Sequence, residues 1–166
     1  MVTRPDVAFL REVPVLKDLD EPTLLALLSR LQERRLRKGE VLFRAGDPGE
    51  ELFLIRSGSI VVSKPVTGRV EQVLSRLGAG EIFGEMCVFG DEPTRSATIQ
   101  AETDSVLLGL HRDALNRFIE SSPRDAAKFF LQMVRVSFKR LRDASDLVAE
   151  VTRWGLEATG LDAEHK

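Results

Sequence analysis

The chain has 166 residues, 43% of them apolar, which suits one folded domain with an appended segment. Its net charge of -2 gives no general attraction to nucleic acid or anionic membranes. Its single cysteine excludes an intramolecular disulfide and a multi-cysteine metal site. No apolar run at the N-terminus has the length of a signal peptide, and none elsewhere could span a bilayer. We therefore expect a cytoplasmic protein without a membrane segment.

Residues 1–38 are predicted to form a helical N-terminal segment. An apolar stripe over residues 6–20, interrupted by Pro14, indicates a short helix with a loose continuation. Asp20 fits an N-cap with Pro22 in the first turn, and the leucines that follow predict a helix to about Arg34. The basic run 34–38 could contact nucleic acid, but cations also complement a helix C-terminus. The acidic chain favours this second interpretation.

Residues 39–111 show short apolar runs separated by glycine turns, such as the turn at residues 46–49. About eight strands at this spacing predict a closed β-roll or jelly roll. The chain is therefore expected to be a mainly-β α+β domain: an eight-stranded roll flanked by the N-terminal helices and a long C-terminal helix.

Residues 112–158 are predicted to form a short helix and then a long one, which begins with a Ser122 cap and Pro123 at its first position. Six residues of the long helix recur at spacings of four and three: Val134, Phe138, Leu141, Ser145, Val148 and Thr152. This seam could pack on the chain's own β-roll or against a second copy. Residues 159–166 are expected to be a flexible tail.

The most informative stretch is residues 80–98, where a glycine-rich turn and a short apolar segment precede Arg95. Apolar residues on both sides place Arg95 at the edge of an apolar pocket, where an unpaired charge is costly. A short helix opening near Gly84 would present the backbone N–H groups of Met86 and Cys87 to an anion. Arg95 could pair bidentately with a phosphate.

Two further residues of this stretch extend the idea of a phosphate site. Ser96 could add a hydroxyl donor beside Arg95. Glu85 would repel a phosphate unless it accepts a hydrogen bond from a hydroxyl, which a sugar next to the phosphate supplies.

Cys87 could be a redox switch, although a small, partly buried thiol is the simpler interpretation. The sequence offers no nucleophile–base pair and no set of metal ligands, so an enzyme is not expected.

The run Phe83-Gly84-Glu85 followed by Arg95-Ser96-Ala97 resembles the phosphate-binding cassette of the cyclic-nucleotide-binding domain family, here residues 82–98. The resemblance covers roughly residues 8–150. It implies that Glu85 holds the ribose 2′-hydroxyl and that Arg95 and Ser96 hold the cyclic phosphate. The ligand-binding set that it implies is Leu74, Phe83, Gly84, Glu85, Met86, Cys87, Arg95, Ser96, Ala97 and Arg140.

Two members of this set come from counting along the family pattern. Leu74 falls where an aliphatic side chain of the family packs against the base, although Leu74 could also be a core residue. Arg140 falls near the position where, in the family, a helical lid closes over the base. Its side chain could stack on a purine, or it could be solvated beside the seam of the long helix. Trp154 could cap the base from further along the same helix.

The resemblance implies a non-enzymatic, homodimeric receptor for a 3′,5′-cyclic purine mononucleotide, joined through the long helix. In this family, alanine or serine after the arginine tends to go with cAMP and threonine with cGMP, so Ser96-Ala97 implies cAMP. Alternative hypotheses are a receptor for cGMP or a cyclic dinucleotide, and a docking module that binds no nucleotide. The sequence ends about ten residues after the long helix, which leaves no room for a DNA-recognition helix. We therefore expect no DNA binding and an output through a protein partner that the sequence does not identify.

Overall fold

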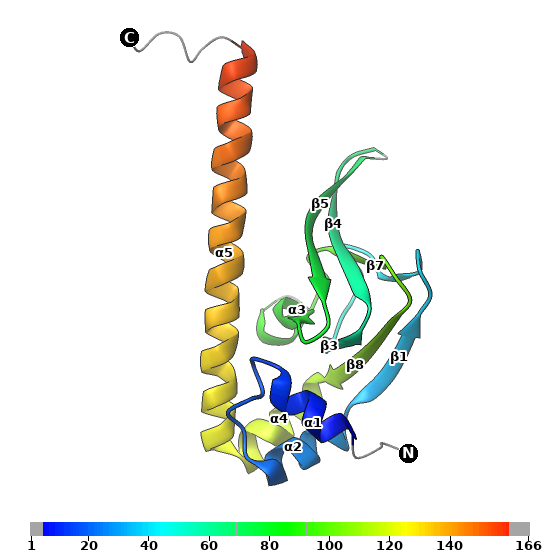
Figure 1. The fold of residues 1–166 in the computed structure, drawn as a ribbon, viewed down its shortest axis with the longest axis vertical. Helices are drawn as coiled ribbons and strands as arrows, with labels where there is room; N and C mark the ends of the chain where they lie inside the picture. Colours follow the sequence, from blue (N-terminus) through cyan, green and yellow to red (C-terminus); the bar gives the residue numbers. More distant parts are fainter. Residues whose placement is uncertain (1–4, 69, 92, 160–166) are drawn as a thin grey trace. The chain divides into compact units, whose positions relative to one another are not determined.

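A computed structural model describes residues 5–68, 70–91 and 93–159. The chain divides into two compact units, Met1–Phe130 and Leu131–Lys166, with the boundary inside the last helix. Within the described residues of the first unit, eight strands form two four-stranded antiparallel sheets (Figure 1). The mainly-β roll with flanking helices is therefore confirmed.

The two sheets interleave strands from distant parts of the sequence. One sheet has the order β1-β8-β3-β6 and the other has the order β2-β7-β4-β5. The first contains β1 (Gln32–Leu36), β8 (Ser105–His111), β3 (Glu51–Ser57) and β6 (Ile82–Phe83). The second contains β2 (Val41–Phe43), β7 (Thr98–Ala101), β4 (Ser59–Thr67) and β5 (Val70–Gly78). This order brings the start of β3, the end of β6 and the turn before β7 together at the site described below.

The main core cluster lies between these sheets and takes residues from both of them. It includes Phe53, Ile55 and Phe83 from one sheet and Ile60 and Ile99 from the other. The Phe53 and Phe83 rings are stacked with their centroids 5.3 Å apart. Strand β3 is buried on both faces, because Leu52, Phe53, Leu54 and Ile55 are all at most 3% exposed.

Four short helices accompany the sheets: α1 (Pro5–Glu12), α2 (Glu21–Leu28), α3 (Glu85–Phe89) and α4 (Arg112–Ser121). Helices α1, α2 and α4 gather at one end of the strands (Figure 1). The Asp20 cap of α2 is confirmed, because its carboxylate accepts a hydrogen bond of 2.8 Å from the Thr23 N–H.

The prediction that this helix continues to Arg34 is wrong, and strands begin before Gly39. Helix α2 ends at Leu28, and Gln32–Leu36 forms strand β1, paired with β8. Pairing with a strand some seventy residues later overrides the local helical pattern. Arg34 and Arg35 therefore lie on an edge strand, where Glu51 and Glu33 form ion pairs with them at 3.6 and 2.7 Å. The interpretation of the basic run as a helix end is wrong as well.

A buried carboxylate joins the last helix, α5 (Pro123–Thr159), to the N-terminal helices. Asp125 is 5% exposed. Its carboxylate accepts hydrogen bonds from the Asp20 N–H at 3.0 Å and from Lys128 Nζ at 2.7 Å. Burial opposes the charge, but these hydrogen bonds outweigh it and lower the pKa of Asp125 to about 2. The charged form is therefore the one that stabilises the fold.

The variant Asp125→Asn is expected to lose about 2 kcal/mol of stability at neutral pH, since the carboxyl pKa is depressed in the folded state. In the wild type this contribution is present above the unfolded pKa near 4 and is lost as the pH falls toward 2. Denaturant melts of both proteins between pH 7 and pH 2 measure it. The difference should shrink across that window, whereas the exposed control Asp146→Asn should match the wild type throughout. An unchanged difference at low pH would contradict the assignment.

The part of α5 in the second unit carries an exposed, mostly apolar seam. Val134, Phe138, Leu141 and Val148 are all exposed. The two hydroxyl residues of the same seam bond to their own helix: Ser145 Oγ donates to Leu141 O at 2.9 Å and Thr152 Oγ1 to Val148 O at 2.8 Å. These polar groups therefore do not oppose burial of the seam. Most of the expected tail, residues 160–166, lies outside the described residues, and no described helix has the length and apolarity needed to cross a membrane.

Candidate functional site

The site forms where β6 ends and the short helix α3 begins. Gly84 joins the two elements with φ of +80°, a left-handed conformation that glycine adopts without strain. A Cβ at this position would lie 3.0 Å from both Glu51 O and Arg95 Nη1. The turn therefore needs glycine twice, for its backbone angle and for the close approach of the arginine.

The loop between β2 and β3 fixes the backbone of Arg95. The Arg95 N–H donates to Asp47 O at 2.8 Å, and Arg95 O accepts a hydrogen bond from the Gly46 N–H at 2.8 Å. The Gly49 N–H donates to Pro93 O at 2.9 Å. The glycine turn predicted at residues 46–49 is thus the element that holds the arginine in place.

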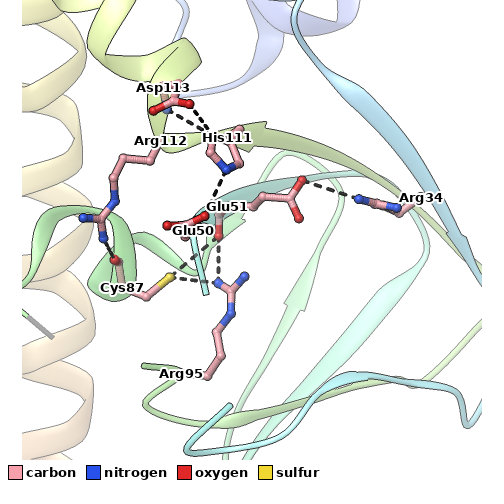
Figure 2. A network of polar contacts seen from close by, with 8 residues as sticks. All are labelled: Arg34, Glu50, Glu51, Cys87, Arg95, His111, Arg112 and Asp113. Atoms are coloured by element: carbon pink, nitrogen blue, oxygen red, sulfur yellow. Dashed lines mark hydrogen bonds and ion pairs between the residues drawn. The ribbon is translucent and has the colours of Figure 1, made fainter. Parts of the chain in front are cut away.

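The Arg95 side chain points into the protein and is only 6% exposed. Its Nη1 donates to Glu51 O at 2.7 Å and to Cys87 Sγ at 3.0 Å, while the guanidinium lies 4.0 Å from the centre of the Phe43 ring. Figure 2 shows the Glu51 carboxylate extending away from Arg95 toward Arg34. Within the described residues, no carboxylate forms an ion pair with Arg95.

The charge of Arg95 is therefore only partly compensated. Its Nε is buried and has no hydrogen-bond partner. Burial lowers the pKa of Arg95, and Cys87, Glu51 and Asp47 act in the opposite direction with smaller effects. Because a guanidinium stays protonated in proteins, the result is a buried cation rather than a neutral group. An anion that entered here would supply the missing compensation.

Cys87 lies between two arginines and is 1% exposed. Its Sγ receives the hydrogen bond from Arg95, and its carbonyl oxygen accepts one from the Arg112 guanidinium (Figure 2). The backbone N–H of Arg112 donates to Glu50 O at 2.8 Å. Burial raises the pKa of the Cys87 thiol, and the two arginines oppose that shift. The thiol form is favoured, which argues against a reactive redox cysteine.

Comparison with known proteins identifies the family of this chain. The family model described as "Cyclic nucleotide-binding domain" matches residues 33–122. The chain belongs to this family. The cyclic AMP receptor protein of Thermus thermophilus is 37% identical over 117 residues, which cover 70% of this chain and 52% of that protein. The cyclic nucleotide-gated potassium channel mll3241 of Mesorhizobium japonicum is also 37% identical over 117 residues, which cover 70% of this chain and 31% of the channel.

A solved cyclic nucleotide-binding domain has the same fold. The crystal structure of such a domain from Methylobacillus flagellatus superimposes with a TM-score of 0.79 at 27% identity, covering 88% of this chain and 84% of that one. These two curated relatives are longer, and the chain spans about a third of the channel and about half of the receptor protein. The shared part is the cyclic nucleotide-binding domain with its β-roll fold.

The structure brings most of the predicted cassette residues of this cyclic nucleotide-binding domain together. Glu85, half-buried, opens α3; Met86 follows it with an exposed side chain; Cys87 is buried beside Arg95. Ser96 is exposed and Ala97 is buried directly after the arginine. The Phe83 side chain belongs to the core cluster, so only its backbone faces the turn.

Leu74 and Arg140 lie outside the cassette. Leu74 is 46% exposed on the edge strand β5, so the alternative that it is a core residue is wrong. It is the extra residue of a β-bulge, since Val62 pairs with Ser75 and Ser63 pairs with Val73. Arg140 lies on α5 in the second unit, and its contact with a base stays a prediction.

Several residues that position the arginine of this nucleotide-binding domain were missed by the sequence analysis. Phe43, Gly49 and Glu51 lie directly against Arg95, and Arg112 binds the carbonyl oxygen of its partner Cys87. Glu51 acts through its backbone carbonyl, which leaves no trace in residue type. Gly49 could be predicted as the last residue of the glycine turn at residues 46–49. That turn pattern does not predict that the Arg95 side chain packs against Gly49.

Gly49→Ala is expected to weaken nucleotide binding by about tenfold, comparable to losing one charge-assisted hydrogen bond. An added Cβ would lie 2.5 Å from Arg95 Cζ and still closer to Nε, so the guanidinium must shift. Calorimetric titration measures the affinity. Gly78→Ala is the matched control, because a Cβ there has no neighbour within 4 Å and affinity should be unchanged. Equal affinities for both variants would show that Gly49 does not constrain Arg95.

Proposed function

We propose that this domain is a non-enzymatic receptor for a 3′,5′-cyclic purine mononucleotide, with cAMP as the preferred ligand. The observation that carries the proposal is Arg95: it is 6% exposed, its Nε has no partner, and no described carboxylate pairs with it. A buried cation of this kind is stable when an anion completes its surroundings.

A cyclic phosphate suits the donors gathered beside Arg95. The guanidinium would bind its charged oxygens, and the exposed Ser96 would add a hydroxyl donor. The backbone N–H groups of Met86 and Cys87, in the first turn of α3, would complete the phosphate contacts. Glu85 opens the same turn and would accept a hydrogen bond from the ribose 2′-hydroxyl. A phosphate without the adjacent sugar would leave this carboxylate facing an anion.

The base would lie beyond the ribose, against the exposed Leu74 of β5. An aliphatic side chain on a strand edge offers the apolar contact that a purine face needs. Arg140 of α5 is the proposed contact from the lid. The preference for cAMP rests on Ser96-Ala97 after the arginine and on the relative named as a cyclic AMP receptor protein.

The output is proposed to pass through α5 to a protein partner in the cytoplasm, without DNA or membrane contact by this segment. Phe89 of α3 packs edge-on against Phe130 of α5 with ring centroids 5.2 Å apart, so the cassette touches the beginning of the long helix. The proposed relay is a movement of α5 between two positions. Ordering of α3 by the ligand can drive this movement only if the protein binds the nucleotide with different affinity in the two positions. The apolar seam of α5 is proposed to join two copies as a homodimer.

Titration calorimetry with cAMP, cGMP, cyclic di-GMP and 5′-AMP tests the proposal. We expect cAMP to bind most tightly. We expect 5′-AMP to bind at least tenfold more weakly, because the phosphate of 5′-AMP is not closed into a ring that holds the ribose in place. At 100 times its dissociation constant, cAMP should stabilise the protein by about 2.7 kcal/mol. Tighter binding of cGMP or cyclic di-GMP would replace the ligand assignment. Binding of none of the four would refute the receptor and favour a docking module.

A further inference from the structure

The contact between Arg95 and the side chain of Cys87 is unusual because the acceptor is a thiol. The Nη1 nitrogen carries two hydrogens and has two partners, Glu51 O at 2.7 Å and Cys87 Sγ at 3.0 Å. The thiol itself donates to Gly84 O at 3.1 Å. The sulfur therefore connects the arginine to the turn that opens α3.

The thiol is a weak acceptor, which suits an arginine that must exchange this hydrogen-bond partner for a ligand. A carboxylate in place of the thiol would neutralise Arg95 and compete with an incoming anion. An alanine would leave one hydrogen of a buried guanidinium without a partner and leave the side chain less well held. A thiol lies between these cases, since it is a weak acceptor that a phosphate oxygen can replace with little loss of free energy.

We propose that the Cys87 thiol is a positioning residue for ligand capture, resting on the receptor function proposed above. It holds the Arg95 guanidinium against α3 before the nucleotide arrives. Part of the ordering that binding requires is therefore already present in the free protein. The burial of Cys87 at 1% exposure fits a fixed internal partner and not a site of modification.

Two substitutions separate the acceptor from the volume it occupies. Cys87→Ala removes the acceptor and is expected to weaken cAMP binding about fivefold, the effect of one lost hydrogen bond. Cys87→Ser restores a donor and acceptor at the same atom and should bind within about twofold of the wild type. Wild-type affinity in Cys87→Ala would overturn the proposal. Equal losses in Cys87→Ala and Cys87→Ser would also overturn it, because the effect would then follow the sulfur's size.

A second measurement needs no ligand and no change at Cys87. The chain has a single cysteine, so its S–H stretching band in the infrared reports on Cys87 alone. Replacing Arg95 with methionine removes the donor to the sulfur, and the band should shift relative to the ligand-free wild type. An unchanged band would refute the contact. If the wild type bound no nucleotide, the receptor function would fail, whereas a shifted band would still establish the thiol–arginine contact.

Discussion

Replacing Arg95 with methionine is expected to abolish nucleotide binding and, at the same time, to raise the stability of the ligand-free protein. Truncating one partner of a buried charge pair typically loses 2–5 kcal/mol, so cAMP affinity should fall by about 100-fold or more. In the free protein Arg95 is 6% exposed and its Nε lacks a partner. An apolar side chain of similar length removes that buried cation and should add about 1–2 kcal/mol of stability.

Calorimetry with cAMP and a denaturant melt without it measure the two effects on the same preparation. The matched control is Arg35→Met on strand β1, because the Arg35 side chain is 78% exposed and forms a surface ion pair with Glu33. That variant should change neither affinity nor stability by much. The account fails if Arg95→Met keeps wild-type affinity. Loss of both binding and stability would instead make Arg95 a structural residue.

Glutamate at two seam positions of α5, Leu141→Glu with Val148→Glu, is expected to convert the proposed homodimer into monomers. Both side chains are about two-thirds exposed in the single chain, and the hydroxyls of Ser145 and Thr152 between and beyond them are satisfied within the helix. The seam can thus be buried without unpaired polar groups. Two carboxylates in it should weaken dimerisation by about 4 kcal/mol, close to 1000-fold.

Sedimentation velocity across a concentration series measures this effect. Glu150→Lys is the control, because residue 150 lies on the side of the helix away from the seam in a heptad pattern. That variant should sediment with the wild type as a dimer. A wild-type protein that stays monomeric at every concentration would refute the α5 dimer. A double variant that remains dimeric would place the interface elsewhere.

The sequence was most informative where function and fold depend on local pattern. Glycine turns between apolar runs are sufficient to predict a β-roll, because each turn and each alternating strand is encoded by neighbouring residues. The same holds for the Asp20 cap and for Pro123 at the start of α5. In each case the physical reason for the residue lies within a few positions of it.

The sequence was least informative where distant backbone decides the structure. Strand β1 exposes four of its five residues and forms because β8 pairs with it, so its own pattern is ambiguous. The partners of Arg95 were hidden for a related reason. An arginine site cannot be predicted from a backbone carbonyl at Glu51, an aromatic face at Phe43 or the missing side chain of Gly49. Only the folded chain brings these three segments to one guanidinium.

A crystal structure of the domain with cAMP tests the central claim most directly. We expect the cyclic phosphate within hydrogen-bond distance of the Arg95 guanidinium and of backbone N–H groups of α3, with the ribose 2′-hydroxyl on Glu85. The Arg95 contact with Cys87 Sγ should be exchanged for a phosphate oxygen. A nucleotide bound elsewhere, with Arg95 still held by Glu51 O and Cys87 Sγ as in the free protein, would contradict the account.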